Sequence, residues 1–219
     1  MQKIIKVITI TTFIAIFSIN LSPTSNAAQN KKVPEVVCKK TSAKVHSIKN
    51  ITPPEVKPPF TNKTFTLTTN CGDIVIEANA KSAPITVTAL SALANGGFFN
   101  KTLCHRLTTN NIFVLQCGDP TGTGRGGPNF SYRDENLPQA VESNYPAGIV
   151  AMYNKEPNTN GSQFFIVYED TSMRPEYTIW GKVTKGLEIV KAIAKEGVAD
   201  GTNDGLPKQT IAIERVKVR

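Results

Sequence analysis

Residues 104–119 of this 219-residue chain read Cys-His-Arg-Leu-Thr-Thr-Asn-Asn-Ile-Phe-Val-Leu-Gln-Cys-Gly-Asp. The pattern predicts two short strands joined by a polar turn. The first strand carries Arg106, and the second brings Phe113 and Gln116 back beside it. A cation, an aromatic ring and an amide on neighbouring strands would form a pocket for a small apolar group that carries a carbonyl.

Outward from this stretch, short strands alternate with turns, and two helical patterns interrupt them. Further strands are predicted at 65–69, 74–77, 148–152, 163–167, 178–183 and 211–218. One helix should begin at Pro84 and end at Asn95-Gly96-Gly97, and a second should start near Leu187 and stop at Gly197. Eight strands with two separated helices predict a mainly β fold: a closed eight-stranded antiparallel β-barrel capped by two α-helices.

The formal net charge of +8 is concentrated before the predicted domain. Residues 28–59 hold seven lysines against two glutamates, whereas residues 60–219 have one net positive charge. A nucleic-acid-binding domain would carry its basic patch on the fold itself, so we expect no nucleic-acid partner. Attraction of residues 28–59 to anionic envelope surfaces stays open as an alternative.

The first 27 residues have the pattern of a signal peptide. Lys3 and Lys6 form a basic start, an apolar run follows over 7–21, and Ser25-Asn26-Ala27 is a small-x-small cleavage site. Cleavage near Ala27 would leave the protein outside the cytoplasm (secreted, periplasmic or at the cell envelope), with no stable membrane insertion. The apolar run is shorter than the roughly 20 residues that a spanning helix needs, but an uncleaved anchor remains an alternative.

Residues 28–63 are rich in lysine and proline and hold few large apolar side chains. Such a composition buries too little surface to offset the entropy of ordering, so it predicts a flexible linker. The folded domain would then comprise residues 64–219.

Four cysteines follow the predicted cleavage site: Cys38, Cys71, Cys104 and Cys117. Disulfides persist outside the cytoplasm, and full pairing allows three connectivities. Cys104 and Cys117 would face each other if their strands pair as a hairpin, although buried free thiols are an equal alternative. We expect no metal site, because the chain has no C-x-x-C pattern and only two histidines.

Two polar stretches resemble catalytic motifs but have simpler interpretations. Residues 120–129 contain four glycines without the Lys-Ser ending of a phosphate-binding loop, so the glycines should permit positive φ or close approach to a ligand. Asp134 and Glu135 are neighbours that would not face each other. We expect them to be solvated or to cap backbone rather than to act as an acid–base pair.

Several motifs together resemble the cyclophilins, a family of peptidyl-prolyl cis–trans isomerases. They are His105-Arg106, residues 113–116 (Phe-Val-Leu-Gln), Gly118-Asp119, residues 122–124 (Gly-Thr-Gly), residues 158–166 (Asn-Thr-Asn-Gly-Ser-Gln-Phe-Phe-Ile) and residues 177–181 (Tyr-Thr-Ile-Trp-Gly). The resemblance runs from about Phe65 to Arg219, with the motifs in the family's order. It implies a capped eight-stranded barrel, in agreement with the strand count above.

The resemblance also implies roles for single residues. The catalytic group would comprise Arg106, Gln116 and Phe113. The substrate would be bound by His105, Val114, Tyr153, Asn154, Gln163, Phe165, Met173 and Tyr177. Within these sets, Arg106 would be the catalytic arginine and Gln163 would brace it. Gln116, and Asn154 through its main chain, would form hydrogen bonds with the substrate backbone. The walls of a proline pocket would be formed by Phe113, Val114, Phe165 and Met173.

The chain departs from the family pattern at several positions. The turn between Arg106 and Phe113 is longer by two residues, with Asn110-Asn111 as its expected tip. Val114 replaces a common methionine, and Tyr153 and Lys155 replace small residues beside the substrate groove. Ser172 falls where cyclosporin-sensitive members carry tryptophan, so weak cyclosporin binding is expected.

The resemblance therefore predicts a monomeric isomerase that acts on proline-containing polypeptides, needs no cofactor and assists the folding of exported proteins. An alternative of a different class is a binding module or chaperone that recognises proline-containing segments, with incidental turnover.

Overall fold

The computed structural model describes residues 35–219. The predicted signal peptide at 1–27 and the first part of the predicted linker lie outside the described residues.

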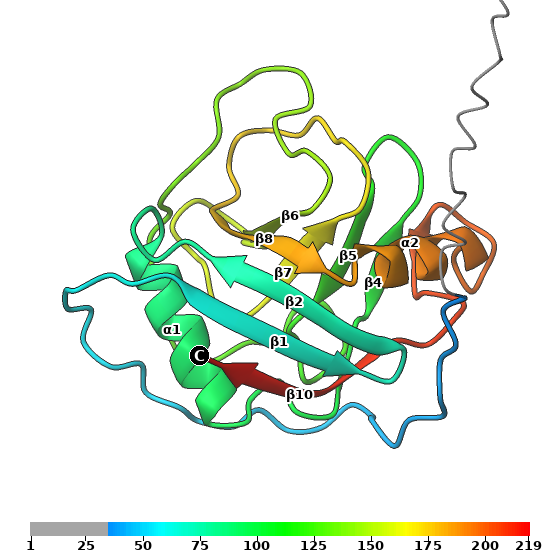
Figure 1. The fold of residues 1–219 in the computed structure, drawn as a ribbon, viewed down its shortest axis with the longest axis horizontal. Helices are drawn as coiled ribbons and strands as arrows, with labels where there is room; N and C mark the ends of the chain where they lie inside the picture. The colour runs from blue at the N-terminus through cyan, green and yellow to red at the C-terminus, as the bar shows by residue number, and fades with distance from the viewer. Residues whose placement is uncertain (1–34) are drawn as a thin grey trace, which may run out of the picture. The chain divides into compact units, whose positions relative to one another are not determined.

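Ten strands and two helices make up the described region (Figure 1). The helices are α1 (Pro84–Asn95) and α2 (Leu187–Glu196). The strands are β1 (Lys63–Thr69), β2 (Gly72–Ala78), β3 (Thr102–Leu103), β4 (Arg106–Thr108), β5 (Val114–Cys117), β6 (Ile149–Met152), β7 (Phe164–Val167), β8 (Ile179–Lys185), β9 (Asp204–Gly205) and β10 (Ala212–Val218).

All ten strands belong to one antiparallel sheet, in the order β3-β10-β1-β2-β8-β6-β7-β5-β4-β9. The sheet is a curled half-barrel, and the prediction of a closed eight-stranded barrel was wrong. The predicted third strand changes partner at Cys104 and His105, whose N–H groups donate to Ile211 O and Gln116 O respectively. Only β4, which pairs with β5, lies within the predicted strand, whereas β3, which pairs with β10, lies just before it. Strand β9 was not among the predicted strands.

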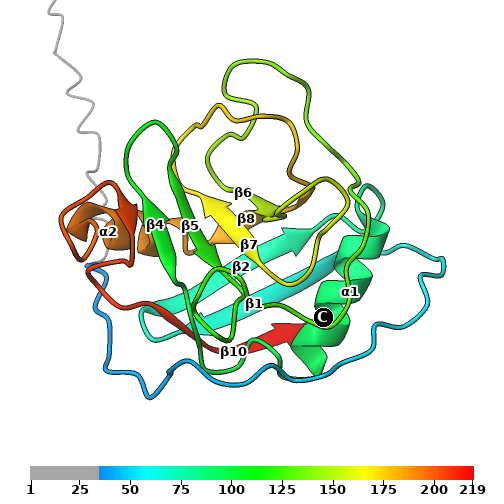
Figure 2. The same ribbon diagram turned by 180° about the vertical axis from the view of Figure 1, so that it is seen from behind.

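The two helices begin and end where the sequence predicted. Proline occupies the first turn of α1, whose buried face includes Val87, Leu90 and Leu93, and the helix lies beside β10 (Figures 1 and 2). Gly197 ends α2 with a φ of 80°, a conformation that favours glycine. No helix within residues 35–219 is long and apolar enough to cross a bilayer.

Glu135 caps the amino-terminal end of α1 from a distant loop. Its carboxylate accepts the backbone N–H of Thr86 at 2.6 Å and that of Ile85 at 3.3 Å. A carboxylate at this end of a helix satisfies orphan donors and complements the helix dipole. The expectation of a backbone-capping role is confirmed for Glu135.

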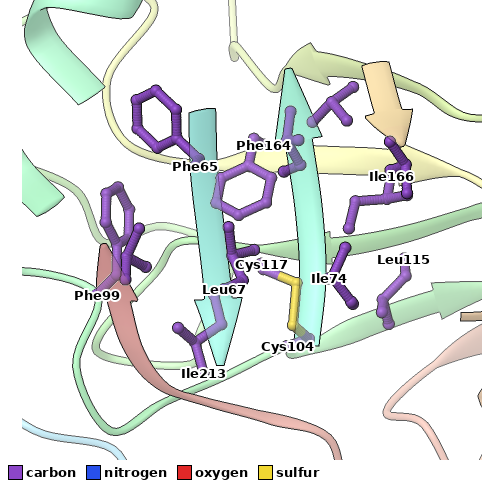
Figure 3. Packing of buried hydrophobic residues seen from close by; sticks show 14 of the residues in the cluster. Phe65, Leu67, Ile74, Phe99, Cys104, Leu115, Cys117, Phe164, Ile166 and Ile213 are labelled. Carbon is purple, nitrogen blue, oxygen red and sulfur yellow. A yellow bond between two sulfur atoms is a disulfide. The ribbon is translucent and has the colours of Figure 1, made fainter. Parts of the chain in front are cut away.

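The main hydrophobic core fills the concave side of the sheet. Figure 3 shows rings and aliphatic side chains from several strands meeting around the Cys104–Cys117 disulfide: Phe65, Leu67, Ile74, Phe99, Leu115, Phe164, Ile166 and Ile213. All of these side chains are buried.

The segment 35–62, which we call the arm, lies against the domain. It contains no helix or strand, but Cys38 forms a disulfide with Cys71 in the β1–β2 turn. Ile51 and Phe60 pack against the main core. In Figures 1 and 2 the arm runs from the β1–β2 turn past β10 and α1 to the start of β1. Residues 35–62 are thus joined to the domain by one disulfide and by apolar contacts.

All four cysteines are paired, as Cys38–Cys71 and Cys104–Cys117. The second pair is the one that the hairpin geometry favoured, because β4 and β5 are antiparallel neighbours. The alternative of buried free thiols was wrong.

Replacing both Cys38 and Cys71 by serine should lower the free energy of unfolding by about 4 kcal/mol, because the bridge closes a separation of 33 residues. Urea unfolding without reductant measures this loss. Limited trypsin digestion should also cut the variant within the arm before it cuts the domain. Unfolding and cleavage identical to those of the wild type would show that the bridge does not hold the arm.

Candidate active site

The site is built on the hairpin formed by β4 and β5. Arg106 pairs with Gln116 across the two strands, so the two side chains lie next to each other on one face of the sheet. The connecting turn has its exposed tip at Asn110 and Asn111, and Asn111 has a φ of 60°. Asparagine tolerates this left-handed conformation better than most residues. The predicted position of the tip is confirmed.

The guanidinium of Arg106 is held from two sides. Its Nε and Nη2 donate to the two carboxylate oxygens of Asp204, each at 2.7 Å, and its Nη1 donates to Gln116 Oε1 at 3.1 Å. A bidentate pair of this kind fixes the plane of the guanidinium as well as its position. Its side chain is still 37% exposed, so its remaining N–H groups can reach a ligand.

The hydrogen bonds continue beyond Gln116. Its Nε2 donates to Gln163 Oε1 at 2.8 Å, and Gln163 Nε2 donates to Gly126 O at 2.8 Å. Gln163 thus braces the arginine indirectly, through Gln116. We call the series Asp204–Arg106–Gln116–Gln163–Gly126 the arginine relay.

Asp119 shapes the glycine loop in which the relay ends. Its buried carboxylate accepts the backbone N–H groups of Thr121, Thr123 and Gly126. Burial raises the pKa of Asp119, but the hydrogen bonds from Thr121 and Gly126 outweigh it, so the net pKa is lowered. A Cβ on Gly126 would lie 2.1 Å from Asp119 Oδ1, so glycine is required there for close approach.

Arg106 and Asp204 stabilise each other's charged forms. The hydrogen bonds from Arg106 lower the pKa of Asp204 despite some burial, and the same bonds raise the pKa of Arg106. Because the pKa of Asp204 in the fold is below its unfolded value, the stabilisation is present above about pH 4 and is lost as the pH falls through the lowered pKa. The pair is therefore fully ionised at neutral pH.

His105 is buried, and its ring lies beside Gly124 in the glycine loop. Burial lowers the pKa of His105, and the charge of Arg106 acts in the same direction, while Asp119 opposes them. The imidazole is therefore neutral at pH 7. It is placed to pack against the loop rather than to supply a positive charge.

An apolar cluster lies beside the relay. It brings together five of the predicted substrate-binding residues: Val114, Tyr153, Phe165, Met173 and Tyr177. The rings of Phe165 and Tyr177 meet edge to face with their centroids 5.5 Å apart. Tyr145 forms the base of the cluster. Its hydroxyl donates to Tyr177 O at 3.2 Å, and burial raises its pKa to about 12.

Phe113 is placed differently from the other predicted pocket residues. It packs against the main core, and its ring centroid lies 5.9 Å from that of Tyr168. Val114, the next residue, belongs to the apolar cluster instead. Successive side chains of an extended segment point to opposite faces, which explains why only one of these two neighbours joins the cluster.

The side chain of Asn154 has a structural role. Its Nδ2 donates to Asp134 Oδ1 at 3.1 Å and to Glu176 O at 2.9 Å. Asp134 also accepts the Asn158 N–H and the Asn160 Nδ2. The carboxylate thus holds the 154–160 loop, and the main chain of Asn154, to which the resemblance assigned the substrate role, takes no part in these bonds.

Sequence reasoning missed Asp204 and Tyr145. Asp204 is 98 residues from Arg106, and its segment of the sequence is polar, with other acidic and amide side chains. No local pattern distinguishes it from Asp200, which bonds only within its own turn. The only sequence signal for Tyr145 is that it is an aromatic residue shortly before the strand predicted at 148–152.

The fold and the site define an antiparallel β protein that presents a braced cation beside an aromatic, apolar cluster. Residues 64–218 match the family described as "Cyclophilin type peptidyl-prolyl cis-trans isomerase/CLD". The chain belongs to this family.

Curated relatives carry the corresponding names. "Probable peptidyl-prolyl cis-trans isomerase B" of Mycobacterium leprae is 41% identical over 182 residues, which covers 74% of this chain and 62% of that protein. The Mycobacterium tuberculosis protein of the same name is 42% identical over 161 residues, 68% of this chain and 52% of that protein. The chain thus spans between half and two thirds of these relatives' length.

A solved cyclophilin-type isomerase from Cryptosporidium parvum has the same fold. It superposes with a TM-score of 0.63 at 30% identity, covering 73% of this chain and 98% of that structure. A second structure of that protein, determined in the presence of the dipeptide Ala-Pro, has a TM-score of 0.61.

Asp204→Ala should reduce kcat/KM for a proline peptide about fivefold, since a half-exposed ion pair contributes about 1 kcal/mol. The loss should appear in kcat if the role of Asp204 is to orient the Arg106 guanidinium, to which it is hydrogen-bonded. Asp204→Asn should lose less, because it keeps one acceptor. Wild-type activity should be flat from about pH 7 to pH 9, where neither partner of the pair titrates.

Asp200→Ala is the matched control, since it removes a carboxylate from the same loop without touching Arg106. Equal activity of the Asp204→Ala and Asp200→Ala proteins would show that the pair does not position the arginine.

Proposed function

We propose that this chain catalyses the cis–trans isomerisation of X–Pro peptide bonds, with Arg106 as the catalytic residue. The observation that carries the proposal is the braced but accessible guanidinium next to the apolar cluster. Family membership supports it, and so does the relative that was studied with Ala-Pro, a dipeptide containing an X–Pro bond.

The reaction needs stabilisation of a twisted amide. Resonance sets a barrier of about 18–20 kcal/mol to rotation about the peptide bond. Rotation makes the prolyl nitrogen pyramidal and exposes a lone pair that is absent in the planar ground state. A guanidinium N–H beside this nitrogen can donate a hydrogen bond to the lone pair only as resonance is lost. The hydrogen bond therefore stabilises the transition state more than the planar substrate.

The apolar cluster and the arginine relay would have different roles in the reaction. The cluster of Val114, Phe165 and Tyr177 would hold the proline ring, while the carbonyl side of the bond rotates. Three N–H groups of Arg106 donate to Asp204 and Gln116. These bonds would keep the guanidinium in one orientation while the peptide bond of the substrate rotates. Arginine suits this role because its fork is planar and always charged. The reaction transfers no electron or group, so the proposal requires no cofactor.

Arg106→Ala should lower kcat/KM by about 10²–10³, the range found when one preorganised transition-state donor is removed. A protease-coupled assay on a proline peptide measures this. Arg106→Lys should recover only part of the activity, since it restores the charge but not the fork. Arg215→Ala, which removes an arginine from the distant β10, is the control. Full activity of Arg106→Ala would overturn the mechanism.

The alternative of a binding module or chaperone predicts a different outcome. An Arg106→Ala protein that still accelerates a proline-limited refolding reaction would favour binding over catalysis. Loss of that acceleration together with the peptide activity would favour the isomerase.

We further propose that the protein acts on exported polypeptides. The signal-peptide pattern of residues 1–27 supports this, and so do two disulfides, which persist outside the cytoplasm. The intact mass of the secreted protein, measured without reductant, tests both points. A chain that begins at Ala28 with no free thiol is expected. A full-length chain retained in the membrane fraction would support the uncleaved anchor instead.

Cyclosporin should bind weakly because Ser172, which is exposed and accepts the Ser143 N–H at 2.8 Å, replaces the tryptophan of sensitive family members. Ser172→Trp should tighten inhibition at least about tenfold, since an indole adds apolar contact and an N–H donor. Ser172→Phe, without the donor, should gain less. Nanomolar inhibition of the unmodified protein would contradict this expectation.

A further inference from the structure

A hollow of about 440 Å³ adjoins the arginine relay. Gly126 and Gln163 belong both to its lining and to the relay. Tyr153 lines it as well and also packs against the apolar cluster. A peptide with its proline ring in that cluster would therefore pass Tyr153 and place a flanking residue in the hollow.

The lining of the hollow combines apolar walls, a charged rim and four polar residues, namely Asn154, Thr159, Ser162 and Gln163. Ile48, Pro128 and Phe130 supply apolar surface. Arg125, Lys155 and Glu156 lie at its edge, and Lys155 Nζ donates to Arg125 O at 3.3 Å. Because the charged groups are exposed, they can stay hydrated while an apolar side chain occupies the space between the walls. The apolar walls would contact an aliphatic or aromatic occupant.

One of these walls comes from the arm. Ile48 is 37% exposed, yet nearby residues on both sides of it are held to the domain by hydrogen bonds. The His46 N–H donates to Pro120 O at 2.9 Å, and Lys49 Nζ donates to Gly97 O at 3.1 Å. Ile51 packs closely on the end of α1, where a Cβ on Gly96 would lie 2.3 Å from its Cδ1. The arm therefore presents Ile48 at a defined place.

Ile48 also lies outside residues 64–218, the part of the chain that matches the family. The other lining residues all lie within that part. The wall at Ile48 is thus an addition made by this chain's own arm.

We propose that Ile48 is a specificity-determining residue. It closes one side of a subsite for an apolar side chain that flanks the X–Pro bond, so the arm takes part in substrate selection. The proposal rests on the proposed isomerase function and adds a substrate preference to it.

The test uses proline peptides in which each residue flanking the X–Pro unit is changed, one at a time, between alanine and leucine. At one flanking position the wild type should favour leucine about fivefold in kcat/KM, a modest gain for a half-open apolar pocket. Ile48→Ala should reduce this preference to less than about twofold. Ile48→Trp, which fills the hollow, should reverse it in favour of alanine.

Val37→Ala is the control, because Val37 is an exposed apolar residue of the same arm that does not line this hollow. It should keep the wild-type preference. Thermal unfolding of each variant checks that the arm remains in place.

An active wild-type enzyme with no leucine preference at any flanking position would overturn the proposal. An unchanged preference in both Ile48 variants would do the same. A wild-type protein without turnover of any peptide would instead overturn the isomerase function on which the proposal rests.

Discussion

The pairing of Arg106 with Asp204 is the interaction on which the site depends. A long side chain loses about 2 kcal/mol of rotamer freedom when it is ordered, so an exposed arginine remains mobile without strong partners. Charge-assisted hydrogen bonds to Asp204 and a further bond to Gln116 offset this loss. The relay connects β9, β4 and β5 to the residue before β7 and to the glycine loop. A cation held in this way can act on a substrate without rearranging first.

Carboxylates serve throughout as acceptors that organise loops and helix ends. Asp119 gathers the backbone N–H groups of the glycine loop, Asp134 holds the 154–160 loop, and Glu135 caps α1. Each carboxylate accepts hydrogen bonds from backbone N–H groups and so fixes the segment that carries them. The loops around the arginine relay are thus shaped by hydrogen bonds, while the hydrophobic core shapes the sheet beneath them.

The arm shows how a segment of unfavourable composition can still be ordered. Its lysines and prolines cannot form a core, but Cys38, Ile51 and Phe60 are spaced so that each reaches the domain. The bridge to Cys71 restricts the unfolded chain, and the two apolar anchors add burial. Ile48 consequently lines the hollow that adjoins the arginine relay.

The sequence by itself determined the local elements and the chemistry of the hairpin. Period-two alternation, turn residues and helix signals depend on neighbours, so they predicted most strands, both helices and the Asn110-Asn111 tip. The family motifs include Arg106, Gln116 and Gln163, whose side chains are linked by hydrogen bonds in the structure. Only the tertiary structure decided which way Phe113 points, that the sheet stays a half-barrel, that the arm is anchored and that Asp204 meets Arg106. These outcomes depend on groups that are far apart along the chain. Strand pairing and packing bring such groups into contact, and a local sequence pattern does not encode those contacts.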